Sequence, residues 1–411
     1  MIYDVVIVGA GAAGAGAARV LAERPLSVLI VEAGQRVGGR GYTATVEGMP
    51  LDLGCGWLHS AERNPFTGLA SAAGFTVDQS PSAWLTQYRD LGFSPQEREA
   101  ARSDWHAVSD RLETVGDSDR AFDAVPPDAP WLNFMQLLSG VSNGAPLDEL
   151  SAADLLAYDA AASANNWRVR EGYGRLISYT LPSLPIRFGT PVTAIETAGD
   201  GVRLSTDVGT ITARSAIVTA STNVLASGTI ALEGGLDEHC HAASLLPLGL
   251  ANKCFLAIDG PSPFEPETHV IGNPRKVESG TYYISAFGRP AIEAYFGGTA
   301  ARALEREGLA AGFTFAVDEL AALFGSDVRR CLRPLAATSW GQQTYFGGSY
   351  SHALVGTSGM RGTLATPYRD RLFFAGEATH PSDFSTAHGA YESGQRAAAQ
   401  VLSALAATAA A

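Results

Sequence analysis

The sequence predicts an α/β fold in which a doubly wound domain of parallel strands and helices is interrupted by a second, α+β domain. The first observation is a near-continuous apolar run at residues 3–8, typical of a parallel strand buried on both faces. The second is a glycine-rich turn directly after it, followed by a helical pattern and another apolar run at residues 27–31. The third is the return of strand patterns after residue 191 and again near residue 371, which indicates a domain assembled from separate segments.

The glycine-rich turn has the pattern Gly-x-Gly-x-x-Gly and opens a helix. In this setting Gly9 allows the tight turn, Gly11 lets the backbone approach a pyrophosphate, and Gly14 lets the helix pack on the strand. The helix N-terminus presents free N–H groups to phosphates. Glu32 ends the second strand, roughly 20 residues after the turn, and is expected to bond ribose hydroxyls. The unit predicts a dinucleotide but does not distinguish FAD from NAD.

Composition argues against several function classes. The chain has 411 residues, 29 Lys and Arg against 42 Asp and Glu, and a net charge of −13, which argues against a nucleic-acid surface. Its 4 cysteines form no Cys-x-x-Cys pair and have no metal-ligand spacing, so we expect reduced thiols and no metal site. We see neither a basic leader nor an apolar run that could span a bilayer, so we expect a cytoplasmic protein without membrane segments.

The rest of the chain alternates between two kinds of pattern. Residues 79–167 are expected to form helices broken by Pro and Gly. Further elements are expected as a β-meander at 191–197, 202–206 and 210–213, strands at 216–220, 252–258 and 371–375, and helices at 317–324 and from about 389. The predicted domains are then 1–78, 169–235 and 345–411 for dinucleotide binding, and 79–168 and 236–344 for substrate binding.

Three further blocks identify a family. Val37-Gly38-Gly39-Arg40 is followed by Asp-Leu-Gly at residues 52–54, residues 374–380 read Phe-Ala-Gly-Glu-Ala-Thr-His, and residues 386–390 read Thr-Ala-His-Gly-Ala. In this order, over nearly the whole chain, the blocks resemble the flavin-dependent amine oxidase family of the monoamine and polyamine oxidase type. The resemblance implies a Rossmann-type FAD-binding domain with an inserted substrate-binding domain.

The resemblance also indicates where FAD would be held. Arg40 would neutralise part of the pyrophosphate, or else form only a surface ion pair. The Glu377 carboxylate fits a ribityl or ribose hydroxyl, and the helix N-terminus near residues 388–390 would direct backbone N–H groups to the flavin N1–C2 region. The predicted cofactor-binding residues are Gly9, Gly11, Ala13, Gly14, Glu32, Ala33, Gly39, Arg40, Val192, Gly376, Glu377, His388, Gly389 and Ala390.

Two single residues are predicted to act at the reacting end of the site. Lys253 lies in the apolar run at residues 250–256, where an unpaired ammonium is costly unless it lines a polar site. In the resembled family such a lysine reaches flavin N5 through a water and assists reoxidation; the alternative is a strand-edge lysine with its head in solvent. His59 follows a Trp-Leu pair that resembles a segment of polyamine oxidases in which a histidine faces the substrate. The alternative for His59 is a buried structural residue.

A second set of predicted catalytic residues lies near the C-terminus. Monoamine oxidases carry a covalent flavin on a cysteine where this chain has Ser349, so FAD is predicted to be non-covalent. Tyr350 is expected to form one wall of an aromatic slot that attracts the amine. Thr386 replaces the second tyrosine of monoamine oxidases, as in spermine oxidases and histone lysine demethylases. Trp340 is expected near the same slot, with core packing as the alternative for Trp340 and Tyr350.

The predicted function is oxidative deamination of a small-molecule amine. A hydride equivalent would pass from the amine α-carbon to flavin N5, the imine would hydrolyse to an aldehyde or ketone, and O2 would reoxidise the flavin to give H2O2. The alternatives are a desaturase or porphyrinogen-type oxidase acting on C–C bonds, and a flavin-bound scaffold without turnover. The polyamine-like motifs and the acidic charge favour extended or cationic amines, but the amine is left open, as is the choice between monomer and homodimer.

Overall fold

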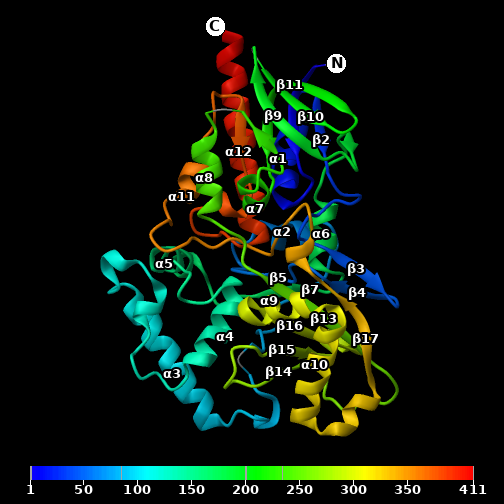
Figure 1. The fold of residues 1–411 in the computed structure, drawn as a ribbon. Coiled ribbons are helices and arrows are strands. Elements are labelled where there is room, and N and C mark those ends of the chain that lie inside the picture. The colour runs from blue at the N-terminus through cyan, green and yellow to red at the C-terminus, as the bar shows by residue number, and fades with distance from the viewer. Residues whose placement is uncertain (1, 85, 200, 234, 411) are drawn as a thin grey trace.

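The computed structural model describes residues 2–84, 86–199, 201–233 and 235–410. Its two large sheets lie at opposite ends of the molecule, and both chain termini lie at the end formed by the first sheet (Figure 1). The predicted class is confirmed: a Rossmann-like α/β unit is joined to a second unit built on an antiparallel sheet.

The first sheet has eight strands. In order across the sheet they are β12 (Ala231–Leu232), β9 (Val192–Ala198), β10 (Gly201–Thr206), β11 (Gly209–Val218), β1 (Ile2–Val8), β2 (Val28–Val31) and β8 (Ile186–Arg187), with β18 (Leu372–Phe374) beside the end of β11. Strands β8, β2, β1, β11 and β18 run parallel, whereas β9, β10 and β11 form the predicted meander.

The two strands expected at residues 210–213 and 216–220 form one strand, β11. Its pairing with β1 runs from Thr212 to Val218, so the chain does not break between the two predicted segments. Its other edge changes partner, because residues 209–213 pair with β10 and residues 216–218 pair with β18. The prediction of two strands was therefore wrong. The residue pattern changes within β11 because its neighbour changes from β10 to β18, so one strand has the pattern of two.

Helices cover both faces of this sheet. Val5 and Ile7 of β1 pack against α1 (Ala12–Ala22) and α12 (Ala387–Ala410). Val6 and Val8, on the opposite face of the same strand, pack against α7 (Thr222–Ala226), α8 (Asp237–Ser244) and α11 (Met360–Ala365). This two-sided burial accounts for the continuous apolar run from which the parallel strand was predicted.

Helices α1 and α12 pack backbone against backbone. A Cβ on Gly16 would lie 2.0 Å from the carbonyl oxygen of Tyr391, and a Cβ on Gly394 would lie 1.9 Å from that of Ala13. Both distances are far shorter than van der Waals contact, so the crossing requires glycine on each helix. This contact fixes the start of α12 relative to the glycine turn that begins α1.

The second sheet has five antiparallel strands. They are β14 (Thr268–Ile271), β15 (Thr281–Ile284), β16 (Ala291–Gly297), β13 (Ala251–Ile258) and β17 (Leu332–Ala337), and helices α9 (Gly298–Glu307) and α10 (Leu309–Phe324) pack on one face. Cys254 and Leu256 of β13 face these helices, so the alternate residues of β13 face the other way, towards the first unit.

The remaining elements surround the junction of the two sheets. A helical lobe consists of α3 (Pro95–Leu112), α4 (Leu132–Asn143) and α5 (Ala152–Ala161), and lies to the side of the second sheet (Figure 1). Smaller elements are α2 (Pro65–Ala72), α6 (Tyr173–Tyr179), the hairpin β3 (Thr43–Val46) and β4 (Met49–Asp52), and the sheet β5 (Trp57–Leu58), β7 (Trp167–Val169) and β6 (Val77–Asp78).

None of the helices in the described part of the chain is long and apolar enough to span a membrane. The exact domain boundaries stay a prediction.

Gly394→Ala is expected to destabilise the protein by about 1–3 kcal/mol, because the added methyl overpacks the α1–α12 crossing. The measurement is the free energy of unfolding in urea. Gly362→Ala is the matched control, since Gly362 also lies in a helix and a Cβ there would meet nothing within 4 Å. The control should change stability by less than about 1 kcal/mol; equal effects of the two substitutions would contradict the backbone contact.

Candidate functional site

One cavity of about 840 Å³ lies between the two sheets and the helical lobe. This volume is near the upper end of the roughly 300–1,000 Å³ typical of ligand sites. Three regions line it: the glycine turn with the ends of β1, β2 and β11, the strands β13 and β16 of the second sheet, and one face of each of α3, α4 and α5. The predicted nucleotide-binding and reacting residues therefore line one continuous cavity, with the exception of Gly14, His388 and Gly389.

The glycine turn forms an open cradle at the start of α1. Gly9 has a φ of +107°, and a Cβ on Gly14 would lie 2.1 Å from the Gly9 carbonyl oxygen. Gly14 therefore packs the helix against the turn and does not itself line the cavity. Gly11 is the N-cap of α1 and lines the cavity, where a Cβ would have its nearest neighbour, the Cα of Gly39, at 3.8 Å. The cradle fits phosphate oxygens at a helix N-terminus.

Glu32 closes this end of the cavity at the end of β2. Its carboxylate accepts hydrogen bonds from the backbone N–H groups of Ala10 and Gly34, both at 2.8 Å. These bonds fix the carboxylate, and its remaining lone pairs are available to a ribose diol. Ala13, Ala33 and Val192 line the same end of the cavity. The residues fit the adenosine half of a dinucleotide such as FAD.

Arg40 forms an internal ion pair, so the alternative of a surface pair does not apply. Its Nη1 lies 3.0 Å from Oε1 of the buried Glu377 and donates to the carbonyl oxygen of Ser349 at 2.7 Å. Glu377 also accepts from the Ser351 hydroxyl at 2.6 Å and from the Ser385 N–H at 2.8 Å. Burial acts to raise the pKa of Glu377, but Arg40 and these hydrogen bonds outweigh it and lower the pKa. Glu377 and Gly376 line the cavity, so the predicted flavin contact of Glu377 would come in addition to these bonds.

Only some of the residues at the start of α12 line the cavity. Thr386, Ala387 and Ala390 line the cavity, whereas His388 and Gly389 do not. The buried His388 ring lies with Nε2 3.1 Å from Oδ1 of Asp383 and Nδ1 3.3 Å from Nδ2 of Asn64. A Cβ on Gly389 would lie 2.0 Å from the Asp383 carbonyl oxygen. His388 and Gly389 therefore pack the preceding loop onto α12, and the contact of backbone N–H groups at residues 388–390 with the flavin stays a prediction.

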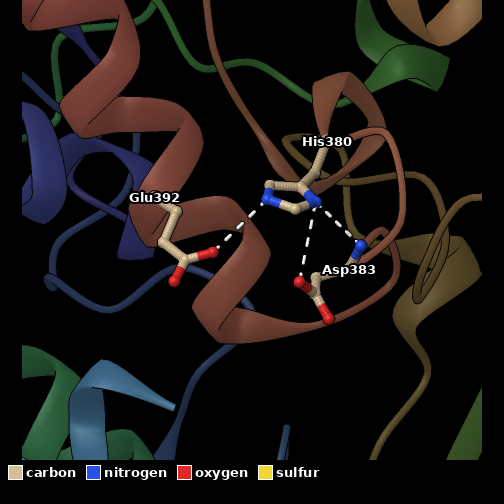
Figure 2. Close-up of side chains that lie close together, drawn as sticks. All are labelled: His380, Asp383 and Glu392. Atoms are coloured by element: carbon tan, nitrogen blue, oxygen red, sulfur yellow. Dashed lines mark hydrogen bonds and ion pairs between the residues drawn. The ribbon is translucent and has the colours of Figure 1, made fainter. Parts of the chain in front are cut away.

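The same loop and helix α12 together carry a cluster with metal-like spacing, formed by His380 and Asp383 of the loop and Glu392 of the helix (Figure 2). Nδ1 of His380 accepts a hydrogen bond from the Asp383 backbone N–H at 2.7 Å, and Nε2 lies 3.3 Å from Glu392. The Asp383 carboxylate is paired with Arg63 at 2.5 Å. Burial acts to raise the pKa of Asp383, but Arg63 and His388 lower it by more. These groups already bond to one another and to the loop, so we assign no metal to them.

Lys253 is buried on β13 and lines the centre of the cavity, so the alternative of a solvent-facing lysine does not apply. Its Nζ donates to the carbonyl oxygen of Asp52 at 2.8 Å and lies 2.9 Å from Oε1 of Glu293. Burial acts to lower the pKa of Lys253, but the charges of Glu293 and Asp52 outweigh burial and raise the pKa. Lys253 is therefore an ammonium ion at neutral pH. A Cβ on Gly56 would lie 3.4 Å from Nζ, so the backbone there also approaches the cation.

Tyr350 is held by two polar contacts on the cavity wall. Its hydroxyl donates to the carbonyl oxygen of Val141 in α4 at 2.7 Å and lies 2.9 Å from the hydroxyl of Tyr295. The neighbouring Ser349 hydroxyl donates to the carbonyl oxygen of Ala251 at 2.8 Å and accepts from the Ala251 N–H at 2.8 Å. Ser349 thus secures the start of β13, while Tyr350 joins the second sheet to the helical lobe.

Trp340 and His59 also line the cavity. Trp340 is buried in the core of the second unit, with its ring 5.5 Å from that of Phe346, so the packing alternative applies, and its role near the slot stays a prediction. His59 places Nδ1 2.7 Å from Oδ1 of Asn166, and its ring lies 5.7 Å from that of Trp84. Burial lowers the pKa of His59 to about 4, so the ring is neutral at pH 7. Since Oδ1 accepts, Nδ1 carries the proton and Nε2 has a free lone pair.

Sequence reasoning missed several residues of the cavity wall. Glu293 and Tyr295 of β16 line it beside Lys253, while Ile292 and Ala294, which alternate with them along the strand, face the core. This alternation was visible in the sequence, but without the pairing of β16 with β13 nothing connected Glu293 to the lysine. An aromatic wall was missed as well: the rings of Trp57 and Trp84 lie 4.5 Å apart, and Trp57 and Tyr283 lie 6.3 Å apart.

Comparisons with known proteins show which family the chain resembles. The family model for flavin containing amine oxidoreductases matches residues 85–402, and the model for an NAD(P)-binding Rossmann-like domain matches residues 7–72. The chain is 28% identical to polyamine oxidase 2 of Arabidopsis thaliana, over 96% of this chain and 87% of that protein. It is 29% identical to lysine-specific histone demethylase 1 homolog 2 of Oryza sativa subsp. japonica, over 97% of this chain but only 57% of that protein.

The fold is also that of a solved enzyme. Wild-type putrescine oxidase bound to putrescine superposes with a TM-score of 0.79 at 18% identity, over 98% of this chain and 99% of that chain. The family model covers more than half of the chain and includes Lys253, Tyr350 and the start of α12. The chain therefore belongs to the family of flavin containing amine oxidoreductases.

Proposed function

We propose that the protein is an FAD-dependent amine oxidase that carries out oxidative deamination with oxygen as acceptor. Bound FAD would supply the chemistry, taking a hydride equivalent at N5 from the amine α-carbon and passing both electrons to O2 to form H2O2. The observation that carries the proposal is the position of Lys253. A buried ammonium lines the same cavity as a dinucleotide cradle, and Glu293 and a backbone carbonyl compensate its charge.

The protein side chains would bind and orient the amine. Tyr350 and Tyr295 are fixed by their hydroxyls, so their rings offer rigid aromatic faces to an amine nitrogen. Neutral His59 has its Nδ1 proton engaged with Asn166, which leaves Nε2 to accept a hydrogen bond from an N–H group. The aromatic walls of the site favour the uncharged amine by excluding water. Hydrolysis of the imine to an aldehyde or ketone would then release ammonia or an amine.

The FAD is proposed to be non-covalent. Ser349 stands in the position at which the resembled monoamine oxidases carry their flavin, but its hydroxyl bonds both backbone groups of Ala251. A hydroxyl lacks the thiolate nucleophile needed for a thioether. Ser349 is therefore proposed as a structural residue, which secures the strand that carries Lys253.

Anaerobic mixing with a panel of primary, secondary and polyamines tests the proposed activity. At least one amine is expected to bleach the oxidised-flavin absorbance at a rate that saturates with amine concentration, and subsequent aeration should restore it with release of H2O2. If no amine in the panel bleached a fully flavin-loaded protein, the oxidase proposal would be wrong. Bleaching by a C–C substrate instead would favour the desaturase-type alternative.

Glu293→Gln is expected to lower the pH at which the rate of flavin reoxidation falls, relative to the wild type. Glu293 raises the pKa of Lys253 against the effect of burial, so its removal lets burial lower that pKa. The ammonium is present below its pKa and lost above it, so the fall in reoxidation rate should move to lower pH. Protein reduced with dithionite and mixed with aerated buffer over a pH series gives the measurement. Glu238→Gln, an exposed carboxylate on α8, is the control, and superimposable pH profiles for all three proteins would refute the pairing.

A further inference from the structure

The helical lobe forms a distinct part of the cavity, here called the helical chamber. Its walls are one face of each of three helices, with Trp105, Val108, Ser109 and Leu112 from α3, Leu138 and Val141 from α4, and Leu155, Tyr158 and Asp159 from α5. The α3 residues recur at the i, i+3, i+4 and i+7 positions of a single helix face. The helix is otherwise rich in charged residues, so its apolar face is directed into the cavity.

The chamber is continuous with the site around Lys253. Val141 lines the chamber, and its carbonyl oxygen accepts the hydrogen bond of Tyr350, which forms part of the proposed aromatic slot. On another side, the Tyr158 ring lies 5.6 Å from that of Phe384, which immediately precedes Ser385 and Thr386 of the cofactor end. A substrate with its amine near Tyr350 would therefore direct the rest of its structure into the chamber.

The chamber offers little compensation for a second positive charge. Among the chamber residues named above, Asp159 alone carries a charge, and its side chain is exposed. The Glu293 carboxylate, which also lines the cavity, is already paired with Lys253. An internal or distal ammonium in the chamber would lose its hydration without gaining a buried counter-ion, which is costly.

We infer that the helical chamber is a subsite for a hydrocarbon tail and that the substrate is a small amine with an alkyl or aralkyl substituent. The inference rests on the proposed amine oxidase function and adds a substrate class to it. It differs from the preference for extended, cationic amines that the sequence motifs suggest. The chamber would recognise the tail by desolvation alone, because each buried methylene contributes without a directed contact.

Anaerobic calorimetry on dithionite-reduced holoenzyme tests the subsite without requiring turnover. The ligands are n-butylamine, n-hexylamine, n-octylamine and 1,8-diaminooctane. Affinity should rise about fourfold per added methylene until the chamber is full, and the diamine should bind far more weakly than octylamine. Equal affinities along the series, or a diamine that binds as tightly as octylamine, would overturn the inference.

Ser109→Trp is expected to fill the chamber and abolish the gain from butylamine to octylamine while butylamine still binds. The matched control is Ser103→Trp on the exposed side of the same helix, which should keep the full chain-length dependence. If both variants kept the chain-length dependence, the tail would bind elsewhere. If Ser109→Trp prevented folding, the wild-type series would still decide.

Parallel anaerobic bleaching separates the two proposals. Bleaching without chain-length dependence would refute the chamber alone, and tail-dependent binding without bleaching would refute the oxidase activity alone.

Discussion

A buried ammonium on an apolar strand is the constraint on which the rest of the site depends. Lys253 is tolerated there because oxygen atoms replace its water: the carbonyl of Asp52 comes from the first unit and the carboxylate of Glu293 from the neighbouring strand. The cation therefore joins two parts of the molecule that are distant in sequence. It can do so only if β13 and β16 stay in register and the end of β4 stays in place.

Other buried polar groups hold the two units in that relation. Arg361 pairs with both oxygens of Asp154 in α5, each at 2.7 Å, and donates to the Ser351 hydroxyl at 3.0 Å. That hydroxyl donates in turn to Glu377, which pairs with Arg40. A chain of charge-assisted hydrogen bonds thus runs from the helical lobe to the cofactor end of the cavity. Together with the glycine contact between α1 and α12, it gives the two ends of the cavity one rigid frame.

Local patterns in the sequence predicted the parts of this account that depend on neighbouring residues. The glycine turn, the buried parallel strands and the unusual position of Lys253 are all visible within short windows. The continuity of β11 and the pairing of Glu293 with Lys253 were not predicted, because both depend on which strand lies alongside, and one sequence does not give strand register. The contact of the His388 ring with Asp383 was not predicted either, because the rotation of α12 is set by its packing on α1 and on the loop that carries Asp383.

We propose that the Lys253 cation acts at the flavin and is more than a structural ion pair. The most direct test is the rate constant for reoxidation of dithionite-reduced Lys253→Met by oxygen, with flavin content measured in parallel. Loss of one preorganised charge should slow the reaction by roughly 100-fold while flavin stays bound. Lys276→Met, at the chain's other, exposed lysine, should react as the wild type does. A flavin-loaded Lys253→Met protein that reoxidised at the wild-type rate would contradict the account.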